Sequence, residues 1–273
     1  MATTMFGVFA AGLTATLASP ALTATELAWL IQSSQPKVIV TASTTLKIVH
    51  AAIEAITDET LRNGLKNVRI YVVDLNPTAS QFLSPSSWEQ LLHKTPLNSP
   101  VSFNSEQECR KRTAVILWSS GTTGRSKGVL LSHNALTTSV ASLWHVFPTY
   151  NGEERFLGIA PFYHVFGLVC VLLLAPSAGS TIYCMLKFDF KTMLDFIATY
   201  RITFLQIAPP IAVHLANNPL VDRADLSSVK GGMSGGAPLP TAIVDRVHER
   251  LGIGIRLVRK KRFRPSSSME NDD

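Results

Sequence analysis

The chain has 273 residues, of which 46% are hydrophobic and 16% charged, with a formal net charge of +6 at pH 7. This composition is sufficient for one large or two small globular domains, and it excludes disorder over most of the length. Half of the net charge lies in the last eighteen residues, which hold six basic and three acidic side chains. The charge therefore argues against a nucleic-acid-binding face on the body of the protein.

The opening 24 residues are uncharged with an apolar middle, as in a secretory signal. No Lys or Arg precedes the apolar part, and Gly12 and Pro20 interrupt it, so a signal peptide is the less favoured interpretation. The three cysteines show no CxxC spacing or pairing pattern, which predicts reduced thiols and a cytoplasmic location rather than disulfides or a zinc site. The apolar run 165–175 is too short to span a bilayer, so we expect no transmembrane segment.

Strands and helices alternate in the first part of the chain. Thr23 and Glu26 have the spacing of a capping box, which predicts the start of a helix. The predicted elements are a helix over 23–33, a strand over 37–41, a helix containing Leu46, Val49, Ile53 and Ile56, a strand over 68–73, and a Pro-, Ser- and Asn-rich surface connection over 74–111. A strand, a helix and a strand in this order imply parallel pairing.

The alternation continues in the second half. Ser132 and Asp189 stand where helix N-caps are expected. Strands are predicted at 155–160, 180–185, 203–208 and 228–233, and helices from about 133 and at 165–175, 190–200, 210–217 and 239–250. The whole pattern predicts an α/β fold in which layered, parallel-rich sheets carry helices on both faces.

A polar loop is predicted between the apolar run Ala114–Trp118 and the apolar residues 129–131. Its residues 119–128 read Ser-Ser-Gly-Thr-Thr-Gly-Arg-Ser-Lys-Gly. Glycines allow backbone amides to approach an anion, hydroxyls can donate hydrogen bonds, and Lys127 supplies a positive charge, so the loop suits a polyphosphate. It is not a Walker A loop, because Ser126 stands where that motif needs Gly. Composition alone is also compatible with an ordinary turn.

Two further segments carry candidate site residues. His164 lies in the sequence Ala-Pro-Phe-Tyr-His-Val-Phe-Gly, although a lone His beside aromatic residues is more often structural than catalytic. Residues 234–239 read Ser-Gly-Gly-Ala-Pro-Leu and follow a predicted strand. These two segments become informative only in combination with the polar loop.

The second of these segments also satisfies a hydrolase pattern. Gly232, Ser234 and Gly236 match G-x-S-x-G, the nucleophile elbow of α/β-hydrolases. An elbow needs a helix directly after the Ser, and the prolines that follow delay it. The downstream Asp245 and His248 lie on one predicted helix rather than on separate loops. A serine hydrolase is therefore the less favoured alternative.

In combination, the three segments resemble the adenylate-forming superfamily of acyl- and aryl-CoA synthetases, 4-coumarate-CoA-ligase-like enzymes, luciferases and peptide-synthetase adenylation domains. Residues 119–129 resemble the phosphate-binding signature SSGTTGxPKGV, with Ser126 in the place of Pro. Residues 234–239 resemble the SGxAPL segment that packs against adenine, and the segment ending in His164 resembles one beside the acyl pocket. The resemblance extends over roughly Gly7–Ile255 and implies the fold of part of the large N-terminal domain.

The resemblance implies an acid-CoA ligase that uses ATP and Mg²⁺, activates a small carboxylic acid as its acyl-adenylate and transfers it to coenzyme A. It implies catalytic roles for Lys127 and His164, the latter in gating substrate or orienting an oxygen rather than in proton transfer. The residues it implies in nucleotide binding are Ser119, Ser120, Gly121, Thr122, Thr123, Gly124, Lys127, Gly235, Gly236, Ala237 and Pro238. No metal-ligating residue is implied within this chain.

The end of the chain departs from the family pattern. The YGxTE-like motif, the ribose-binding Asp and the catalytic Lys of the small C-terminal domain do not follow Ile255. We therefore expect a truncated, partial AMP-binding domain over 1–255 and a basic, Ser-rich disordered tail over 256–273, with impaired activity. The alternative is a non-catalytic remnant that binds nucleotide or a protein partner. The six basic residues within 256–264 also match a nuclear-localisation run, a pattern common by chance.

Overall fold

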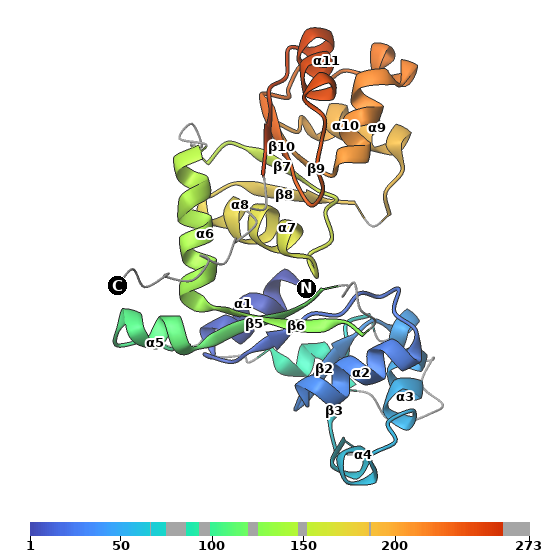
Figure 1. The fold of residues 1–273 in the computed structure, drawn as a ribbon, viewed down its shortest axis with the longest axis vertical. Helices are drawn as coiled ribbons and strands as arrows, with labels where there is room; N and C mark the ends of the chain where they lie inside the picture. Colours follow the sequence, from blue (N-terminus) through green and yellow to red (C-terminus); the bar gives the residue numbers. More distant parts are fainter. Residues whose placement is uncertain are drawn as a thin grey trace, which may run out of the picture. The chain divides into compact units, whose positions relative to one another are not determined.

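The computed structural model has the mixed α/β fold that the sequence predicts. The chain divides into two compact units, Met1–Ser139 and Val140–Asp273 (Figure 1). The structure describes residues 1–65, 67–74, 86–92, 99–119, 125–146, 152–185 and 187–258.

The described part of the first unit combines short helices with two three-stranded sheets. Its helices are α1 (Ala2–Ala10), α2 (Ala24–Ser34), α3 (Ser43–Glu54), α4 (Glu59–Leu65), the 3-10 helix η1 (Trp88–Leu91), α5 (Glu106–Lys111) and the start of α6 (His133–Val146). Its strands are β1 (Ala15–Thr16), β2 (Val38–Thr41), β3 (Arg69–Val72), β4 (Ser86–Ser87), β5 (Thr113–Ser119) and β6 (Lys127–Ser132). One sheet has the order β2-β3-β4 and the other β1-β5-β6.

The predicted capping box at the start of α2 is confirmed. The Glu26 N–H donates to Thr23 Oγ1 at 3.3 Å, and the Thr23 N–H donates to Glu26 Oε2 at 2.8 Å. These bonds satisfy backbone donors that a helix N-terminus otherwise leaves unpaired. The helix then buries Leu30 and Ile31 against the rest of the unit. Ser132 likewise caps α6 by accepting a hydrogen bond from the Ala135 N–H at 3.2 Å.

The two sheets of this unit differ in strand direction. In the first, β2 and β3 pair in parallel, as the strand-helix-strand pattern predicts. In the second, β5 pairs in parallel with β1 but antiparallel with β6. Because β6 follows β5 after only a short connection, it can return only antiparallel to it. This sheet is therefore mixed, within the parallel-rich fold that the sequence predicts.

The predicted surface connection over 74–111 contains regular structure in its described parts. These parts form β4, η1 and α5. Helix α5 is short and polar, with Ser105 as its N-cap and an Arg110–Glu106 ion pair of 2.7 Å. Such a helix has no apolar periodicity to reveal it. The uncharged segment at the chain start contains helix α1, which was also not predicted.

The second unit is built on a five-stranded parallel sheet. Its elements are β7 (Arg155–Gly158), α7 (Val165–Gly167), the π-helical η2 (Leu168–Leu173), α8 (Leu174–Ser177), β8 (Thr181–Cys184), α9 (Phe190–Tyr200), β9 (Phe204–Ile207), α10 (Pro209–Asn217), the 3-10 helix η3 (Pro219–Arg223), β10 (Gly231–Ser234), α11 (Thr241–Leu251) and β11 (Ile255–Leu257). The strand order is β11-β10-β9-β7-β8. The single helix predicted over 165–175 is thus α7, η2 and α8, with π-helical geometry in its middle.

Helices cover both faces of this sheet, as predicted (Figure 1). Successive strand residues point to opposite faces. Leu157 and Leu205 therefore join the core formed with α9, α10 and α11, while Phe156 and Phe204 join the core formed with α7, η2 and α8. The central strands β7 and β9 are largely apolar and buried on both sides, which is typical of a parallel sheet between helix layers.

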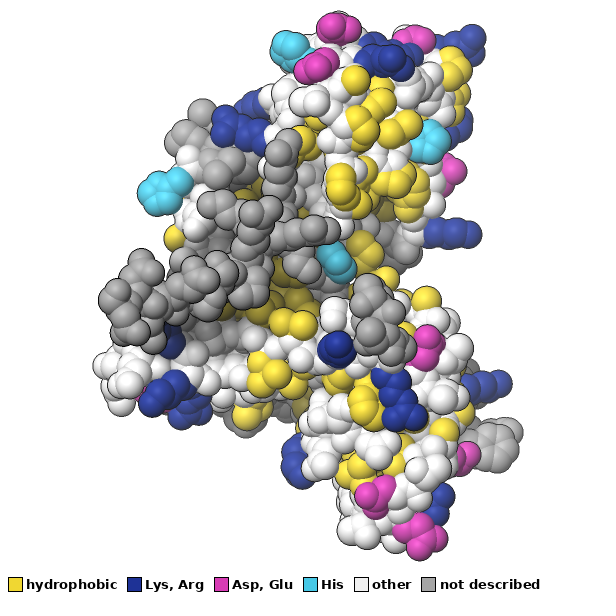
Figure 2. All heavy atoms as spheres, viewed as in Figure 1, with side chains coloured by type: hydrophobic (Ala, Val, Ile, Leu, Met, Phe, Trp, Pro, Cys, Tyr) yellow, Lys and Arg dark blue, Asp and Glu magenta, His cyan; other side chains and the backbone are white. Residues whose placement is uncertain are grey.

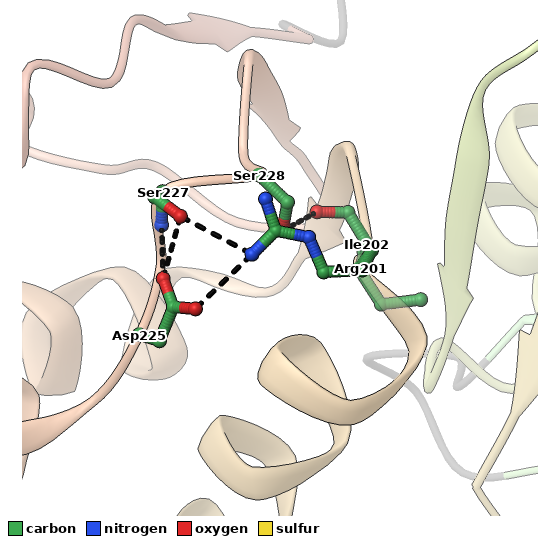
Figure 3. Close-up of polar contacts among 5 residues, drawn as sticks. All are labelled: Arg201, Ile202, Asp225, Ser227 and Ser228. Carbon is green, nitrogen blue, oxygen red and sulfur yellow. Dashed lines mark hydrogen bonds and ion pairs between the residues drawn. The ribbon is translucent and has the colours of Figure 1, made fainter.

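A polar clamp holds the segment before β10 to the end of α9 (Figure 3). Arg201 ends α9 in the left-handed region with φ 52°, and its guanidinium donates to Asp225 Oδ2 at 3.1 Å and Ser227 Oγ at 3.3 Å. Ser228 Oγ donates to the Ile202 carbonyl at 2.8 Å. Hydrogen bonds from Ser227, with a smaller contribution from Arg201, lower the pKa of Asp225. The clamp fixes where the chain enters β10, which precedes a candidate binding segment.

The tail boundary predicted at Arg256 is too early. Arg256 pairs with Met233 and Leu257 with Ser234 in the parallel ladder between β10 and β11. Backbone pairing at a sheet edge does not need apolar composition, which explains why a composition argument misplaces the boundary. The prediction of disorder for 259–273 lies outside the described residues.

The described Lys and Arg side chains form no concentrated positive patch on the face drawn in Figure 2. Among the described residues, no helix is long and apolar enough to cross a membrane. On the face that Figure 2 draws, the described Lys and Arg side chains are scattered, with Asp and Glu between them. Hydrophobic side chains are also exposed on both units, among them Leu130 with 65% of its surface accessible.

Candidate functional site

The structure describes both flanks of the predicted phosphate loop, which are Ser119 on the N-terminal side and residues 125–128 on the C-terminal side. Ser119 is the last residue of β5 and Lys127 the first of β6, and the two face each other in the antiparallel ladder. The loop predicted over 119–128 is therefore too long at both ends, because the hairpin pairs up to the 119–127 position. The predicted binding residues between the flanks, Ser120, Gly121, Thr122, Thr123 and Gly124, lie outside the described residues.

Lys127 is exposed where the loop enters β6. In the described part of the chain, no carboxylate forms an ion pair with it. Ser119 Oγ donates a long hydrogen bond of 3.4 Å to the Lys127 carbonyl, which keeps the two flanks together. The Lys127 ammonium is therefore available to an anionic ligand.

An open pocket of about 650 Å³ lies within the first unit beside the C-terminal flank of the loop. Its wall combines two cationic side chains, two indoles and several hydroxyl groups. The lining residues are Trp29, Ser33, Ser34, Ile116, Trp118, Arg125, Ser126, Lys127, Gly128 and Leu130. This combination suits a ligand that carries negative charge and a flat or apolar part.

The other predicted segments follow strands of the parallel sheet in the second unit. His164 lies after β7, and Gly235–Pro238 come directly after β10, so both segments lie at the carboxyl edge of the sheet. From β7 the chain proceeds to β8 on one side, and β9 lies on the other side. The direction of winding therefore changes between β7 and β9. In open α/β sheets, ligands bind at the carboxyl edge at such a switch.

His164 is held as the N-cap of α7. Its Nδ1 accepts a hydrogen bond from the Phe166 N–H at 3.3 Å, and the backbone N–H of His164 donates to the Pro161 carbonyl at 3.0 Å. A neutral imidazole that accepts at Nδ1 carries its proton on Nε2. The side chain is exposed. His164 can thus donate an Nε2–H hydrogen bond to an oxygen, which fits an orienting role.

Two glycines bring the segments after β7 and β10 together. A Cβ at Gly167 would stand 2.2 Å from the Pro161 carbonyl oxygen, so the segment that carries His164 closes on itself only with Gly there. A Cβ at Gly235 would stand 2.8 Å from the ring of Phe166. Gly235 is buried under that ring, and the next residues, Gly236–Pro238, are exposed. The backbone after Gly235 is therefore open to solvent at the carboxyl edge of the sheet.

Ser234 does not have the setting of a nucleophile. It is the last residue of β10, its side chain is 2% exposed, and its Oγ has no hydrogen-bond partner among the described residues. Helix α11 begins only at Thr241, so the tight strand-to-helix turn of a nucleophile elbow is absent at this position. Asp245 and His248 both lie on α11.

Two features were not predicted, one at the loop flank and one in β9. Trp29, on helix α2, contacts the loop flank. The helical pattern around Trp29 does not indicate this contact, because the partner lies 97 residues later in the chain. Gln206 lies in β9 with both amide atoms buried and without a partner in the described chain. Gln206 could have been noticed in the sequence as the lone amide within the apolar run 204–210, because burying an unpaired amide costs free energy.

Comparison with known proteins gives a consistent result. Residues 1–259 match the family described as AMP-binding enzyme. The 4-coumarate–CoA ligase 1 of Petroselinum crispum is 32% identical over 248 residues, which cover 88% of this chain and 41% of that protein. The peroxisomal OPC-8:0-CoA ligase 1 of Arabidopsis thaliana is 30% identical over 249 residues, covering 89% and 42%. The chain thus spans less than half the length of these curated relatives.

Solved structures share the fold. A red-emitting luciferase from Phrixothrix hirtus superposes with a TM-score of 0.78 at 27% identity, covering 92% of this chain and 46% of that one. The N-terminal domain of FACL13 from Mycobacterium tuberculosis superposes with a TM-score of 0.74 at 22% identity, covering 94% and 58%, which shows the fold alone. With the family match over 1–259, these findings establish that the chain belongs to the AMP-binding family of adenylate-forming enzymes.

Proposed function

We propose that this chain binds ATP and a carboxylic acid as the adenylating part of an AMP-forming acid-CoA ligase. The observation that carries the proposal is the exposed Lys127 ammonium, which stands without a carboxylate partner in the described chain at the end of a Ser-, Thr- and Gly-rich loop. Membership of the AMP-binding family and the carboxyl-edge position of the other segments support it.

The reaction has two steps. An oxygen of the substrate carboxylate attacks the α-phosphorus of ATP, the bond to the β-phosphate oxygen breaks, and pyrophosphate leaves. The sulfur of coenzyme A then attacks the acyl carbon, the thiol loses its proton, and AMP leaves. Negative charge accumulates on the phosphates in the first step, and a positive charge already held in place stabilises it.

The described residues would divide the work as follows. Lys127 would neutralise phosphate charge, with Ser119 and the loop hydroxyls and amides as hydrogen-bond donors. The Nε2–H of His164 would orient a carboxylate or phosphate oxygen. The exposed backbone at Gly236–Pro238 would contact the adenine ring. A cytoplasmic location remains a prediction from the cysteine pattern.

Magnesium would enter this site together with ATP. Among the residues that the structure describes, no three His, Cys, Asp or Glu side chains gather closely enough to hold a metal ion. None of the roles above depends on a magnesium ion held by the protein alone, and a magnesium ion that enters with ATP would be held mainly by the phosphates, whose charge it would offset.

The decisive test is calorimetric titration of the full chain with ATP and with pyrophosphate. A charged hydrogen bond contributes about 1.5 to 3 kcal/mol, so Lys127→Ala should weaken binding by roughly tenfold to a hundredfold. Lys47→Ala is the matched control, because Lys47 is an exposed lysine on α3 in the same unit. Equal affinities for the wild type and Lys127→Ala would refute the assignment.

A second measurement separates ligation from binding. The chain is incubated with ATP, magnesium, coenzyme A and a panel of fatty and aromatic acids, and released pyrophosphate is measured against Lys127→Ala. Release that depends on the acid supports adenylation. Nucleotide binding without any release would instead support a non-catalytic nucleotide-binding role.

A further inference from the structure

Trp29 contacts the C-terminal flank of the phosphate loop from a distant part of the sequence. Its indole Nε1–H donates to the carbonyl oxygen of Ser126 at 2.9 Å, 97 residues later in the chain. The guanidinium carbon of Arg125 lies 4.7 Å from the centroid of the same indole ring. One side chain on α2 therefore holds two consecutive residues of the flank.

We propose that Trp29 is a positioning residue for the C-terminal flank of the phosphate loop and places Lys127 for an anionic ligand. This inference rests on the proposed function. It goes beyond that function because Trp29 lies far from residues 119–129 in the sequence, outside the stretch that carries the phosphate-binding pattern.

The geometry explains how a contact at Ser126 acts on Lys127. The Ser126 carbonyl and the Lys127 nitrogen belong to one planar peptide group. A hydrogen bond to that carbonyl oxygen therefore fixes the plane from which the Lys127 Cα departs. The stacked Arg125 guanidinium adds a second attachment one residue earlier and directs its own charge onto the indole face.

The N-terminal flank has an anchor of the same kind. Trp118, next to the end of β5, donates its indole N–H to Thr16 Oγ1 of β1 at 2.9 Å. The two flanks are thus held separately, Trp118 fixing the exit from β5 and Trp29 fixing the entry to β6. Only Trp29 bonds to the peptide group that leads into Lys127, so its loss should affect ligand affinity as well as local stability.

The test compares two substitutions in the full chain. Trp29→Phe keeps an aromatic ring under Arg125 but removes the N–H donor, and Trp29→Leu removes both. Trp144→Phe is the matched control, because it removes an indole N–H that donates to Ser177 Oγ at 3.2 Å in the second unit. Each variant is measured for its thermal midpoint, for its pyrophosphate affinity by calorimetry, and for its rate of tryptic cleavage after Arg125, with fragments identified by mass.

Loss of one hydrogen bond should open the flank about fivefold to tenfold more often. We therefore expect Trp29→Phe to accelerate cleavage after Arg125 and to weaken pyrophosphate binding by about that factor. Trp29→Leu should have a larger effect on both measurements, since it also removes the cation–π contact. Trp144→Phe should leave cleavage after Arg125 and pyrophosphate affinity unchanged.

Two results would overturn the inference. Unchanged cleavage after Arg125 in both Trp29 variants would show that the indole does not hold the flank. Faster cleavage with unchanged pyrophosphate affinity would show that Trp29 is structural and does not position Lys127. If the wild type binds no pyrophosphate, the proposed function and the positioning role fail together, while the cleavage rates still decide whether Trp29 anchors the flank.

Discussion

The ring of Phe166 lies so close to Gly235 that a Cβ at residue 235 would stand 2.8 Å from two of its carbons. This contact joins the segment after β7 to the segment after β10, the two candidate binding segments of the second unit. Real Cβ atoms are essentially never this close to another heavy atom, so the spacing of the two segments depends on the missing side chain. His164 is two residues before Phe166 and caps the same helix.

Gly235→Ala should therefore destabilise the protein and disturb the site. Either the Phe166 ring or the backbone must move, and overpacking of this kind costs about 1 to 3 kcal/mol. Urea unfolding measures the loss. The control is Gly254→Ala, because a Cβ at Gly254 meets no atom within 4 Å. Adding Phe166→Leu should recover part of the loss, and a cost no larger than that of Gly254→Ala would contradict the argument.

Gln206→Leu should raise stability. Both side-chain amide atoms of Gln206 are buried, the residue is 0% exposed, and neither atom has a partner in the described chain. Replacing a buried unpaired amide with an apolar side chain of similar size removes a penalty of about 1 to 3 kcal/mol. Urea unfolding of the variant beside the wild type measures the difference. A loss of stability would show that a buried water or ligand completes the hydrogen bonds of the amide.

Local signals in the sequence predicted much of the fold. The capping residues Thr23 and Asp189 mark their helices because the bonds involved span only three residues, and the Thr192 N–H does donate to Asp189 Oδ1 at 2.8 Å. The parallel sheet of the second unit was also predicted, because each strand and helix is recognised from neighbouring residues and their alternation implies parallel pairing. Helix α5 and strand β6 were missed, since a short polar helix and an exposed strand lack an apolar period.

The site was predicted only in part. The motif segments were recognisable because each is continuous in sequence, and β7 and β10 place two of them at one sheet edge. The contacts that hold these segments are not continuous. Folding brings Trp29 to Ser126 and Phe166 to Gly235, which are far apart in the sequence. The secondary-structure propensity of one residue in such a pair does not indicate which distant residue it will contact. The roles of the loop residues between Ser119 and Arg125 stay predictions.

Stability should fall as the pH drops through the histidine range because of His133. Burial, and to a smaller extent the charge of Arg112, lower the pKa of His133, whose Nε2 has no partner in the described structure. The ring also contacts those of Phe9 and Phe103. With a folded-state pKa below the unfolded value of 6.5, the unfolded chain takes up the proton first. Stability is therefore full above pH 6.5 and decreases as the pH falls from there toward the folded-state pKa.

The measurement is the free energy of unfolding in urea between about pH 7.5 and pH 5, within the range where histidines titrate. The pKa values of some carboxylates, such as those of Asp189 and Asp225, are lowered in the folded state. These groups lose their contribution to stability only at more acidic pH, so they do not affect the slope measured between about pH 7.5 and pH 5. His133→Phe should flatten the pH dependence in this range. The control His248→Asn, at an exposed position on α11, should not. An unchanged slope in His133→Phe would contradict the assignment.

Ser234 should not react with a serine-directed probe, although its surroundings match the G-x-S-x-G pattern. Its Oγ is buried and contacts no base in the described structure, and the six residues between Ser234 and α11 leave no tight turn to expose it. A hydroxyl without an adjacent base is a weak nucleophile. After incubation with a fluorophosphonate, mass spectrometry of the peptide containing Ser234 should show no adduct, while a known serine hydrolase in the same reaction is labelled. Labelling of the wild type that disappears in Ser234→Ala would restore the hydrolase alternative and count against adenylation as the function of this segment.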